Sequence, residues 1–582
     1  MNILFLTHSF NSLAQRLFIE LTRCGHDISL EFDISDSITE QAVELYRPDL
    51  VIAPFLKRAI PETVWRSVPC FVVHPGIVGD RGPSALDWAI MHGYREWGVT
   101  VLQANSEMDA GDIWAYETFS MRFASKSSLY RHEVTEAAIK AVLTAVDRFL
   151  SGTYQPVPLA KACQQLGNNH GKQHMPIRQI DRAIEWQQDD THTVLKKIFA
   201  ADGFPGVLDP LYGAHFYLFD AWAEATLHGD KPGAVIAQRQ GAICRATIDG
   251  AVWIGHLKRK SDTEPTLKLP ATVVLSEHMI DVPVIPPEPL PTSNEGSYAA
   301  YRDIWFEQSN QVGYLHFVFY NGAMSSSQCE QLREAYLMAS QSKVRVIVLM
   351  GGPDFWSNGI HLNLIEHAAS PADESWRNIN AMNDLVRAIL TNTRQLTLAA
   401  LQGNAGAGGV FLSLAADRIY ARKSVILNPH YKSMGNLYGS EYWTYLLPKR
   451  VGKKKAKELT DNRLPIDAAD AQQMGLIDGY FELNHADFRK KIEQIAQQLA
   501  ASTDYAHLLA SKQQQRERDE REKPLDSYRA EELHQMQLNF YGFDPSYHVA
   551  RYHFVFRIPH AWTPLYLARH RQRFKMESGE GI

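Results

Sequence analysis

Cysteine is scarce in this sequence, and no two cysteines lie close together. The chain has 582 residues and only Cys24, Cys70, Cys163, Cys244 and Cys329, with no Cys-x-x-Cys pair. Zinc knuckles and disulfide frameworks depend on cysteines at short, regular spacings, so neither is supported here. We therefore expect free thiols that are buried or incidental.

Long basic runs and bilayer-length apolar runs are missing as well. The formal net charge is −6, which argues against nucleic acid as a partner. No segment has the apolar length of a membrane span, and Met1–Leu6 lacks the basic start of a signal peptide. We expect a soluble, cytoplasmic protein without a membrane partner.

Hydrophobic residues make up 45% of the chain, and their pattern predicts an α/β protein of several domains. The first part alternates strands and helices, which predicts an open parallel sheet with ligands beyond the carboxyl ends of its strands. No Gly-x-Gly-x-x-Gly follows the first strand, which disfavours a nicotinamide-dinucleotide site. The expected strands are 3–7, 27–32, 49–53 and 71–73, with a helix over 12–22.

The middle of the chain changes character. Four short β-rich runs separated by glycine turns predict a small, OB-like β-barrel. The sequence also predicts a helix over 181–200, and the prolines of 281–297 indicate an extended linker. The β-rich runs are 215–218, 233–237, 242–247 and 252–257, and strand–helix alternation resumes at 312–317 and 344–350.

Three motifs of the first part occur together and in a fixed order. They are Val72-Val-His-Pro-Gly76, Gly98-Val-Thr-Val-Leu102 and Met108-Asp-Ala-Gly-Asp-Ile113. This arrangement resembles the formyltetrahydrofolate-dependent formyltransferases, and the β-rich segment resembles the small C-terminal domain of methionyl-tRNA formyltransferase. The resemblance implies 10-formyltetrahydrofolate as a substrate and a catalytic pair formed by His74 and Asp109. It also implies that Phe55, Leu56 and Lys57 line the folate pocket.

The implied chemistry suits these residue types. A histidine can stabilise the oxyanion that forms when a nucleophile attacks the formyl carbon, and a carboxylate can relay a proton to the departing nitrogen. One position departs from the family: Val72 replaces an asparagine that helps to polarise the formyl oxygen. Water therefore stays open as an alternative formyl acceptor.

A glycine-rich turn, Leu401–Asp417, and the segment Phe355–Leu362 carry a second signature. They resemble the crotonase, or enoyl-CoA hydratase/isomerase, superfamily, which implies that the chain binds coenzyme A thioesters. The backbone N–H groups of Ile360 and Gly408 would form an oxyanion hole, and Gly359 and Gly409 would let the thioester approach the backbone.

The second site lacks the groups that hydrate an enoyl thioester. Phe411 stands where the first water-activating glutamate is expected, and Tyr431 aligns with the second. Tyr431 could donate a hydrogen bond to the thioester, or it could be a core aromatic residue. Glu441 could supply a carboxylate, or it could be a solvated loop acid. Ordinary hydration is therefore not expected.

Taken over nearly the whole length, this fusion resembles a family of NiFe-hydrogenase maturation factors. The resemblance implies that the formyl group passes to coenzyme A and that formyl-CoA then yields carbon monoxide. Hydrogenase maturation proteins or the hydrogenase large subunit would be partners. Two alternatives remain: a formyltetrahydrofolate hydrolase with a regulatory CoA-binding domain, and a non-enzymatic scaffold.

The resemblance also suggests domain boundaries. We expect a folate-binding formyltransferase-like domain at 1–170, a β-barrel at 171–275, a linker at 276–299, a crotonase-like α/β domain at 300–540 and an aromatic tail at 541–582. The tail contains His548, His553 and His560, whose spacing matches no common ligand pattern. We expect no metal site, and we expect the tail to serve packing between domains.

Overall fold

The first domain is built on a twisted six-stranded sheet. The computed structural model describes residues 1–167, 171–286 and 301–572. The strand order is β2-β1-β3-β4-β5-β6, in which the first four strands are parallel and the last two antiparallel. The predicted parallel sheet is thus confirmed, with an antiparallel pair added at one edge. Its strands are β1 (Asn2–Thr7), β2 (Asp27–Phe32), β3 (Leu50–Phe55), β4 (Cys70–His74), β5 (Glu96–Gln103) and β6 (Ile113–Ser120).

Helices cover both faces of this sheet. The apolar stripe of α1 packs with α6 on one face, and α2 and α3 close the other. Central strands covered on both sides read as continuous apolar runs, which is why the sequence located them. The helices are α1 (Ser12–Arg23), α2 (Asp36–Tyr46), α3 (Glu62–Trp65), α4 (Ala85–His92), α5 (Lys126–Leu129), the π-helical turn η1 (Tyr130–Val134), α6 (Thr135–Ser151) and α7 (Leu159–Leu166).

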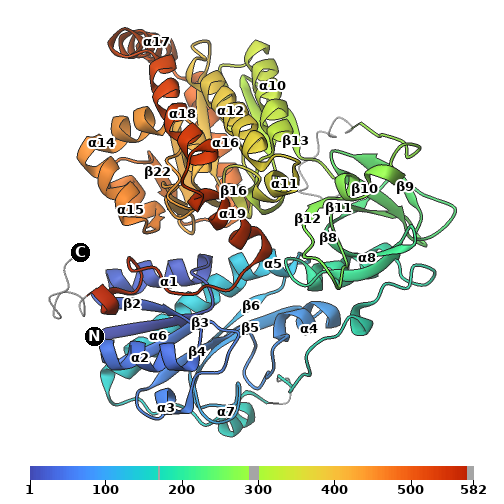
Figure 1. Ribbon diagram of the computed structural model, residues 1–582, viewed down its shortest axis with the longest axis vertical. Helices are drawn as coiled ribbons and strands as arrows, with labels where there is room; N and C mark the ends of the chain where they lie inside the picture. Colours follow the sequence, from blue (N-terminus) through green and yellow to red (C-terminus); the bar gives the residue numbers. More distant parts are fainter. Residues whose placement is uncertain (168–170, 287–300, 573–582) are drawn as a thin grey trace.

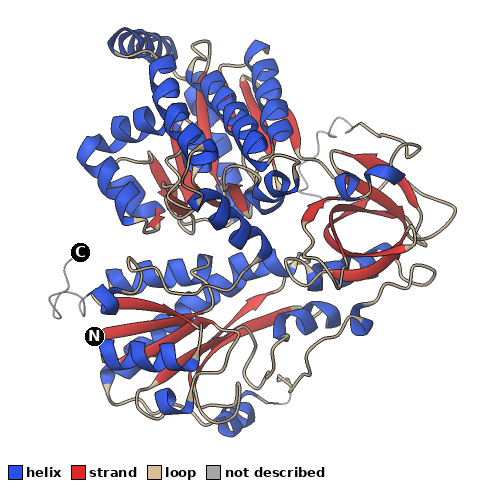
Figure 2. Cartoon of the chain, in the orientation of Figure 1, coloured by secondary structure: helices blue, strands red, loops and turns tan. Residues whose placement is uncertain are grey.

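The second domain is a curved antiparallel sheet that bends into a barrel shape (Figure 2). Its order is β7-β8-β11-β10-β9, and β12 pairs with β11. The strands are β7 (Val207–Leu211), β8 (Ala214–Glu224), β9 (Val235–Arg239), β10 (Ala242–Ala246), β11 (Ala251–Arg259) and β12 (Lys268–Pro270), with the short helices η2 (Ile180–Arg182), α9 (Ala271–Val274) and η3 (Ser276–His278).

The helix predicted over 181–200 is wrong in its first half. Helix α8 spans Thr191–Ala201 and begins where the Asp190 carboxylate accepts the N–H of Thr193. The Asp189 carboxylate bonds back to the N–H of Glu185, so the preceding segment forms a turn instead. Most of the predicted proline linker, residues 287–297, lies outside the described residues.

The third domain contains two sheets. The larger has the order β13-β14-β15-β17-β19-β22, and the smaller has the order β16-β18-β20-β21. All neighbours are parallel except β13 with β14 and β20 with β21. The strands are β13 (Ile304–Ser309), β14 (Val312–Phe317), β15 (Val346–Leu349), β16 (Phe355–Ser357), β17 (Leu396–Leu401), β18 (Asn404–Gly406), β19 (Arg418–Arg422), β20 (Ile426–Asn428), β21 (Ile466–Asp467) and β22 (Gly479–Phe481).

Helices surround these sheets, and the last four form the C-terminal part of the chain. Residues of α10, α12 and α13 pack on one face of the larger sheet, and residues of α16 pack on the other. The helices are η4 (Tyr320–Gly322), α10 (Ser326–Gln341), α11 (Leu362–His367), α12 (Pro371–Leu390), α13 (Gly408–Leu414), α14 (Trp443–Asn462), α15 (Ala468–Gln473), α16 (His485–Ala501), α17 (Tyr505–Glu522), α18 (Leu525–Tyr541) and α19 (Ser546–Phe556).

After α19 the chain leaves the third domain and crosses to the first, where its last described residues pass beside β2 (Figure 1). There the carbonyl of Leu567 accepts the N–H of Leu30. The buried Glu31 carboxylate accepts hydrogen bonds from Thr563, His570 and Arg571. The tail therefore joins the two domains through a buried ionic contact.

Candidate functional site

His74 is the last residue of β4 and is 4% exposed. Its Nε2 lies 3.0 Å from Oδ1 of Asp80, and its Nδ1 lies 3.5 Å from Oδ1 of Asp109. The structure thus brings the predicted pair His74 and Asp109 together and adds a carboxylate that sequence reasoning missed. Asp80 stands inside the Gly79-Asp-Arg-Gly82 turn, and its closeness in sequence to His74 was the available signal.

Asp109 has a left-handed backbone, with φ of 55°. This conformation is costly for a non-glycine residue and is found where surrounding structure fixes it. The Oδ2 atom of Asp109 accepts the N–H of Gly82 at 3.2 Å, which ties the Asp-x-Gly-Asp turn to the turn that carries Asp80. Two loops therefore position the carboxylates around one imidazole.

The predicted folate-pocket residues follow β3 at the same edge of the sheet. The Phe55 carbonyl accepts the N–H of His8, and the Lys57 N–H donates to Asp33. Leu56 packs in the same hydrophobic cluster as Val72, two residues before His74. An apolar wall therefore replaces the amide that an asparagine would supply at position 72.

In the third domain the two predicted oxyanion-hole segments meet. Gly408 is the first residue of α13, so its N–H has no helical carbonyl to bind. A Cβ at Gly359 would lie 3.4 Å from the nitrogen of Gly408, and one at Gly409 would lie 2.0 Å from the carbonyl oxygen of Ser357. Glycine at these positions is what allows the segment of Ile360 to approach the turn.

The turn itself is strained. Ala407, directly before Gly408, has φ of 48° and ψ of −128°. Its N–H donates to the carbonyl of Asn428, which holds the turn against β20. A non-glycine residue in such a conformation marks a position that the fold over-determines, as is common where a backbone amide must point at a ligand.

Glu441 and Tyr431 lie beside this turn. The Tyr431 hydroxyl donates to Oε2 of Glu441, and a Cβ at Gly408 would lie 2.9 Å from Oε1 of the same carboxylate. Burial raises the pKa of Glu441 to about 8 and raises that of Tyr431 well above its usual value. The ring of Tyr431 stacks on Phe411 at 5.4 Å, which excludes water from that side.

The backbone of the loop that carries Glu441 is held by groups with no distinctive sequence signal. Asn383 of α12 accepts the Glu441 N–H at 2.7 Å, and Glu441 itself has φ of 61°. Glu532 of α18 accepts the N–H of Tyr442 at 2.9 Å, and burial raises its pKa to about 7. Glu441 is thus a buried acid on a fixed loop and not a solvated one.

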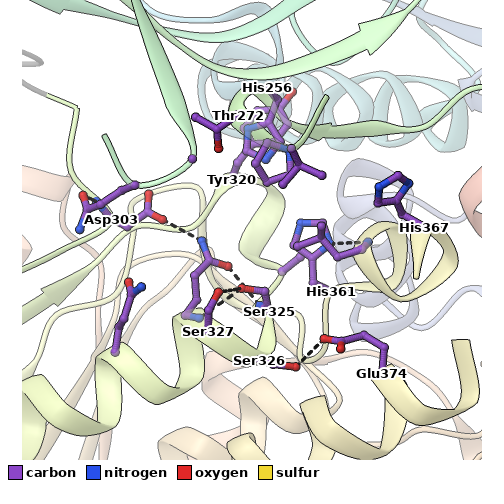
Figure 3. A pocket seen from close by; sticks show the side chains of 18 of the residues that line it. His256, Thr272, Asp303, Tyr320, Ser325, Ser326, Ser327, His361, His367 and Glu374 are labelled. Atoms are coloured by element: carbon purple, nitrogen blue, oxygen red, sulfur yellow. Dashed lines mark hydrogen bonds between the residues drawn. The ribbon is translucent and has the colours of Figure 1, made fainter. Parts of the chain in front are cut away.

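A cavity of about 450 Å³ lies between the second and third domains, beside the segment Phe355–Leu362 (Figure 3). It reaches that segment at His361, the residue after Ile360, and does not include Gly408 or Glu441 in its lining. Some polar side chains of its wall bond to one another: Ser326 donates to Glu374, and Gln328 donates to Asp303.

The first domain touches the glycine turn of the third. Asn428, whose carbonyl holds Ala407, donates through its side chain to Gln15 of α1 at 3.2 Å. Arg16 donates to the carbonyl of Ser424 at 3.0 Å. Helix α1 therefore contacts β20, the strand that holds the glycine turn at Ala407.

Among the residues that the structure describes, no group of three or more metal-ligating side chains is found. Of the three tail histidines, His548 and His553 lie in α19, where His548 bonds to the Phe540 carbonyl, and His560 stacks on Phe32. Within the same residues, no helix is long and apolar enough to cross a membrane.

Comparison with family models defines the class of protein. Residues 32–146 match the formyl transferase model, residues 176–268 match its C-terminal domain, and residues 315–539 match enoyl-CoA hydratase/isomerase. The chain is thus a formyltransferase module joined to a crotonase-like module, as the motifs predicted.

Two relatives that match nearly the whole chain identify the family within this class. The chain is 53% identical over 573 residues to hydrogenase maturation factor HoxX of Bradyrhizobium diazoefficiens, covering 98% of both chains. It is similar to the crystal structure of HypX from Aquifex aeolicus in complex with tetrahydrofolic acid, with a TM-score of 0.92, 49% identity and 98% of both chains covered. The chain belongs to the HypX/HoxX family of hydrogenase maturation factors, which confirms the resemblance inferred from the sequence.

Proposed function

We propose that this protein transfers the formyl group of 10-formyltetrahydrofolate to the thiol of coenzyme A and then splits formyl-CoA into carbon monoxide and CoA. The observation that carries the proposal is the buried Glu441–Tyr431 pair beside the Gly408 amide. The HypX relative that was crystallised with tetrahydrofolic acid supports folate as the ligand of the first domain. The enoyl-CoA hydratase/isomerase module supports coenzyme A as the carrier in the third.

The first step takes place at His74 and Asp109. The loop of Phe55, Leu56 and Lys57 lines one side of the folate site, and the sulfur of coenzyme A attacks the formyl carbon. The imidazole of His74 lies where it can accept or donate a proton, and Asp109 relays a proton to the departing folate nitrogen. The step yields tetrahydrofolate and formyl-CoA.

The second step takes place in the third domain. The N–H groups of Ile360 and Gly408 bind the thioester oxygen, with Gly359 and Gly409 keeping the space open. The ionised form of Glu441 removes the formyl proton, the carbon–sulfur bond breaks, and carbon monoxide leaves. The thiolate then takes a proton from Tyr431, which regains one from Glu441, so the net change moves one hydrogen from carbon to sulfur.

Carbon monoxide is released for the NiFe site of a hydrogenase. Hydrogenase maturation proteins or the hydrogenase large subunit are the partners that would receive it, in keeping with the family to which the chain belongs. The contact between Gln15 and Asn428 brings the first domain close to the glycine turn that carries Gly408. This closeness favours transfer of the thioester between sites without release.

Two conservative variants test the assignment of the second step. Glu441→Gln and Tyr431→Phe should each lower carbon monoxide production at least about 100-fold, because the proton-transferring group is lost while the shape is kept. Formyl-CoA should accumulate in both. Tyr420→Phe, at a part-buried tyrosine of β19 stacked on Phe481, is the matched control and should behave as wild type.

The same assay separates the rival functions. Formate formed without coenzyme A, and without carbon monoxide, would show a hydrolase with a regulatory CoA-binding domain. Full hydrogenase maturation by His74→Ala would show a scaffold that needs no chemistry at the folate site.

A further inference from the structure

The imidazole of His74 is bracketed by two carboxylates that differ in burial and distance. Asp80 is completely buried through its side chain and lies 3.0 Å from Nε2. Asp109 is 11% exposed through its side chain and lies 3.5 Å from Nδ1, which is longer than a good hydrogen bond. Asp80, on the Nε2 side, is therefore both the closer and the more buried of the two carboxylates.

The backbone around the His74–Asp80 contact leaves no space for added side-chain atoms. A Cβ at Gly76 would lie 2.4 Å from Nε2 of His74 and 2.7 Å from Oδ1 of Asp80, so only glycine leaves room for the bond. On the other side, a Cβ at Gly171 would lie 1.8 Å from the backbone nitrogen of Asp80. The 171–174 segment thus closes over Asp80.

The second oxygen of Asp80 has an unusual environment. Within the described residues, Oδ2 is buried and has no hydrogen-bond partner. Its neighbour is Nε2 of His174, at 3.7 Å, and the His174 ring stacks on Trp88 at 5.5 Å. A buried carboxylate with one free oxygen gains most of its stabilisation from its other contact, which here is His74.

On these grounds we propose that Asp80 is a positioning residue that holds His74 in the Nε2–H tautomer, so that Nδ1 is the base for the thiol of the acceptor. This inference rests on the proposed function, because it assigns the base for the first step. A buried carboxylate that fixes the tautomer of a catalytic histidine is a general arrangement for activating a weak nucleophile.

The proton and electron pairs balance in this step. The S–H proton passes to Nδ1 of His74 as the sulfur–carbon bond forms and the formyl oxygen becomes an oxyanion. The bond between carbon and the folate nitrogen then breaks, and the proton leaves Nδ1 for that nitrogen through Asp109 or water. Asp80 keeps its contact with Nε2–H throughout and gains or loses no atom.

A thiol acceptor explains why such a base is useful. A thiol reacts as its thiolate, and an ordinary thiol is mostly protonated at neutral pH. Val72 supplies no hydrogen bond to the formyl oxygen, so the site relies more on the nucleophile than on polarising the formyl group. The Asp80–His74 pair raises the reactivity of the nucleophile instead.

The test compares Asp80→Asn with Asp220→Asn. Asp220 forms a part-buried pair with His256 in the second domain at the same 3.0 Å distance, which makes it a matched control. The assay follows both formyl-CoA and formate made from 10-formyltetrahydrofolate. Asp80→Asn should lower formyl-CoA formation about 10³-fold at neutral pH with tetrahydrofolate affinity kept within about twofold.

The pH dependence of the rate separates the two roles, because a purely structural defect would not change with pH. The defect of Asp80→Asn should shrink as the acceptor thiol ionises by itself, whereas Asp220→Asn should track wild type at every pH. A transfer rate within about twofold of wild type, or a defect that does not change with pH, would overturn the assignment.

A measurement on the unmodified protein covers the case in which Asp80→Asn does not fold. Nitrogen-15 shifts of labelled histidine, with the His74 signals identified by their loss in His74→Asn, should show Nε2 protonated and Nδ1 free. An Nδ1–H tautomer would contradict the inference. If wild type makes formate but no formyl-CoA, the proposed function fails, while the tautomer result still decides the role of Asp80.

Discussion

At the scale of single residues, the buried carboxylic acids of the third domain carry the most specific information. Glu441 is 1% exposed, its pKa is raised to about 8 by burial, and its carboxylate accepts a hydrogen bond from the Tyr431 hydroxyl. An acid with this pKa can exchange a proton near neutral pH, as a general base must. A glutamate with its ordinary pKa is ionised at neutral pH but is a weaker base.

This pKa predicts the pH dependence of the second step. Only about a tenth of Glu441 is ionised at pH 7, so the rate of carbon monoxide release from formyl-CoA should rise about tenfold between about pH 7 and pH 9. Single-turnover rates with preformed formyl-CoA would measure it. A rate that falls over this range would show that the protonated acid is the active form.

The same burial predicts how stability responds to pH. The pKa of Glu441 is raised from 4.5 in the unfolded chain to about 8, so the folded protein binds more protons between these values and loses stability as pH rises. Glu441→Gln removes this dependence, which amounts to at most about 1.4 kcal/mol per pH unit. Urea unfolding at about pH 5.5 and about pH 7.5 should show the variant gaining on wild type; parallel curves would contradict the raised pKa.

Some site residues were accessible from the sequence and others were not. Short sequence motifs made some residues recognisable, because their spacing reflects the turns that the backbone must form. These residues are His74, Asp109, Tyr431 and the glycines. Residues that support them from distant helices, such as Asn383 and Glu532, look like ordinary polar helix positions. Their burial depends on tertiary packing, which local pattern does not encode.

At the scale of elements, the close packing of the turn between β18 and α13 fixes the position of the Gly408 amide. It fits between Ser357 of β16 and the Glu441 loop with no space for added atoms at Gly408 or Gly409. Its apolar pattern and glycines were clear in the sequence. The strain at Ala407 was not, because alanine has no sequence preference for a left-handed backbone.

A methyl group at this turn should therefore disrupt it. Gly409→Ala would place Cβ 2.0 Å from a backbone oxygen, which must move, and we expect a loss of about 2–3 kcal/mol in unfolding free energy and most of the carbon monoxide activity. Gly406→Ala meets only the end of the Asn358 side chain at 3.3 Å and is the control. Equal unfolding midpoints for the two variants would contradict the packing described here.

At the scale of the whole molecule, the tail after α19 extends from the third domain and contacts the other two. Arg557 donates to the carbonyl of Gly203 in the second domain, and His570 bonds to Ser29 and Glu31 in the first. The sequence predicted that the tail serves packing between domains. It did not indicate which strand receives the tail, because the partners of the buried Glu31 lie more than 500 positions away in the sequence.

Removing the central acid of this contact should release the tail. Glu31→Ala removes the one carboxylate that pairs with both His570 and Arg571, and we expect a loss of about 3–5 kcal/mol in unfolding free energy and faster proteolysis after α19. Glu44→Ala, at an exposed position of α2, is the control. If the two variants are cleaved at the same rate, the buried contact does not hold the tail.

The central claim is that one carbon atom leaves folate, travels on coenzyme A and is released as carbon monoxide. The most direct measurement incubates the purified protein with 10-formyltetrahydrofolate labelled in the formyl carbon and traps carbon monoxide on haem. We predict labelled carbon monoxide that requires coenzyme A and disappears in Asp109→Ala. Labelled formate as the sole product, whether or not coenzyme A is present, would contradict the account.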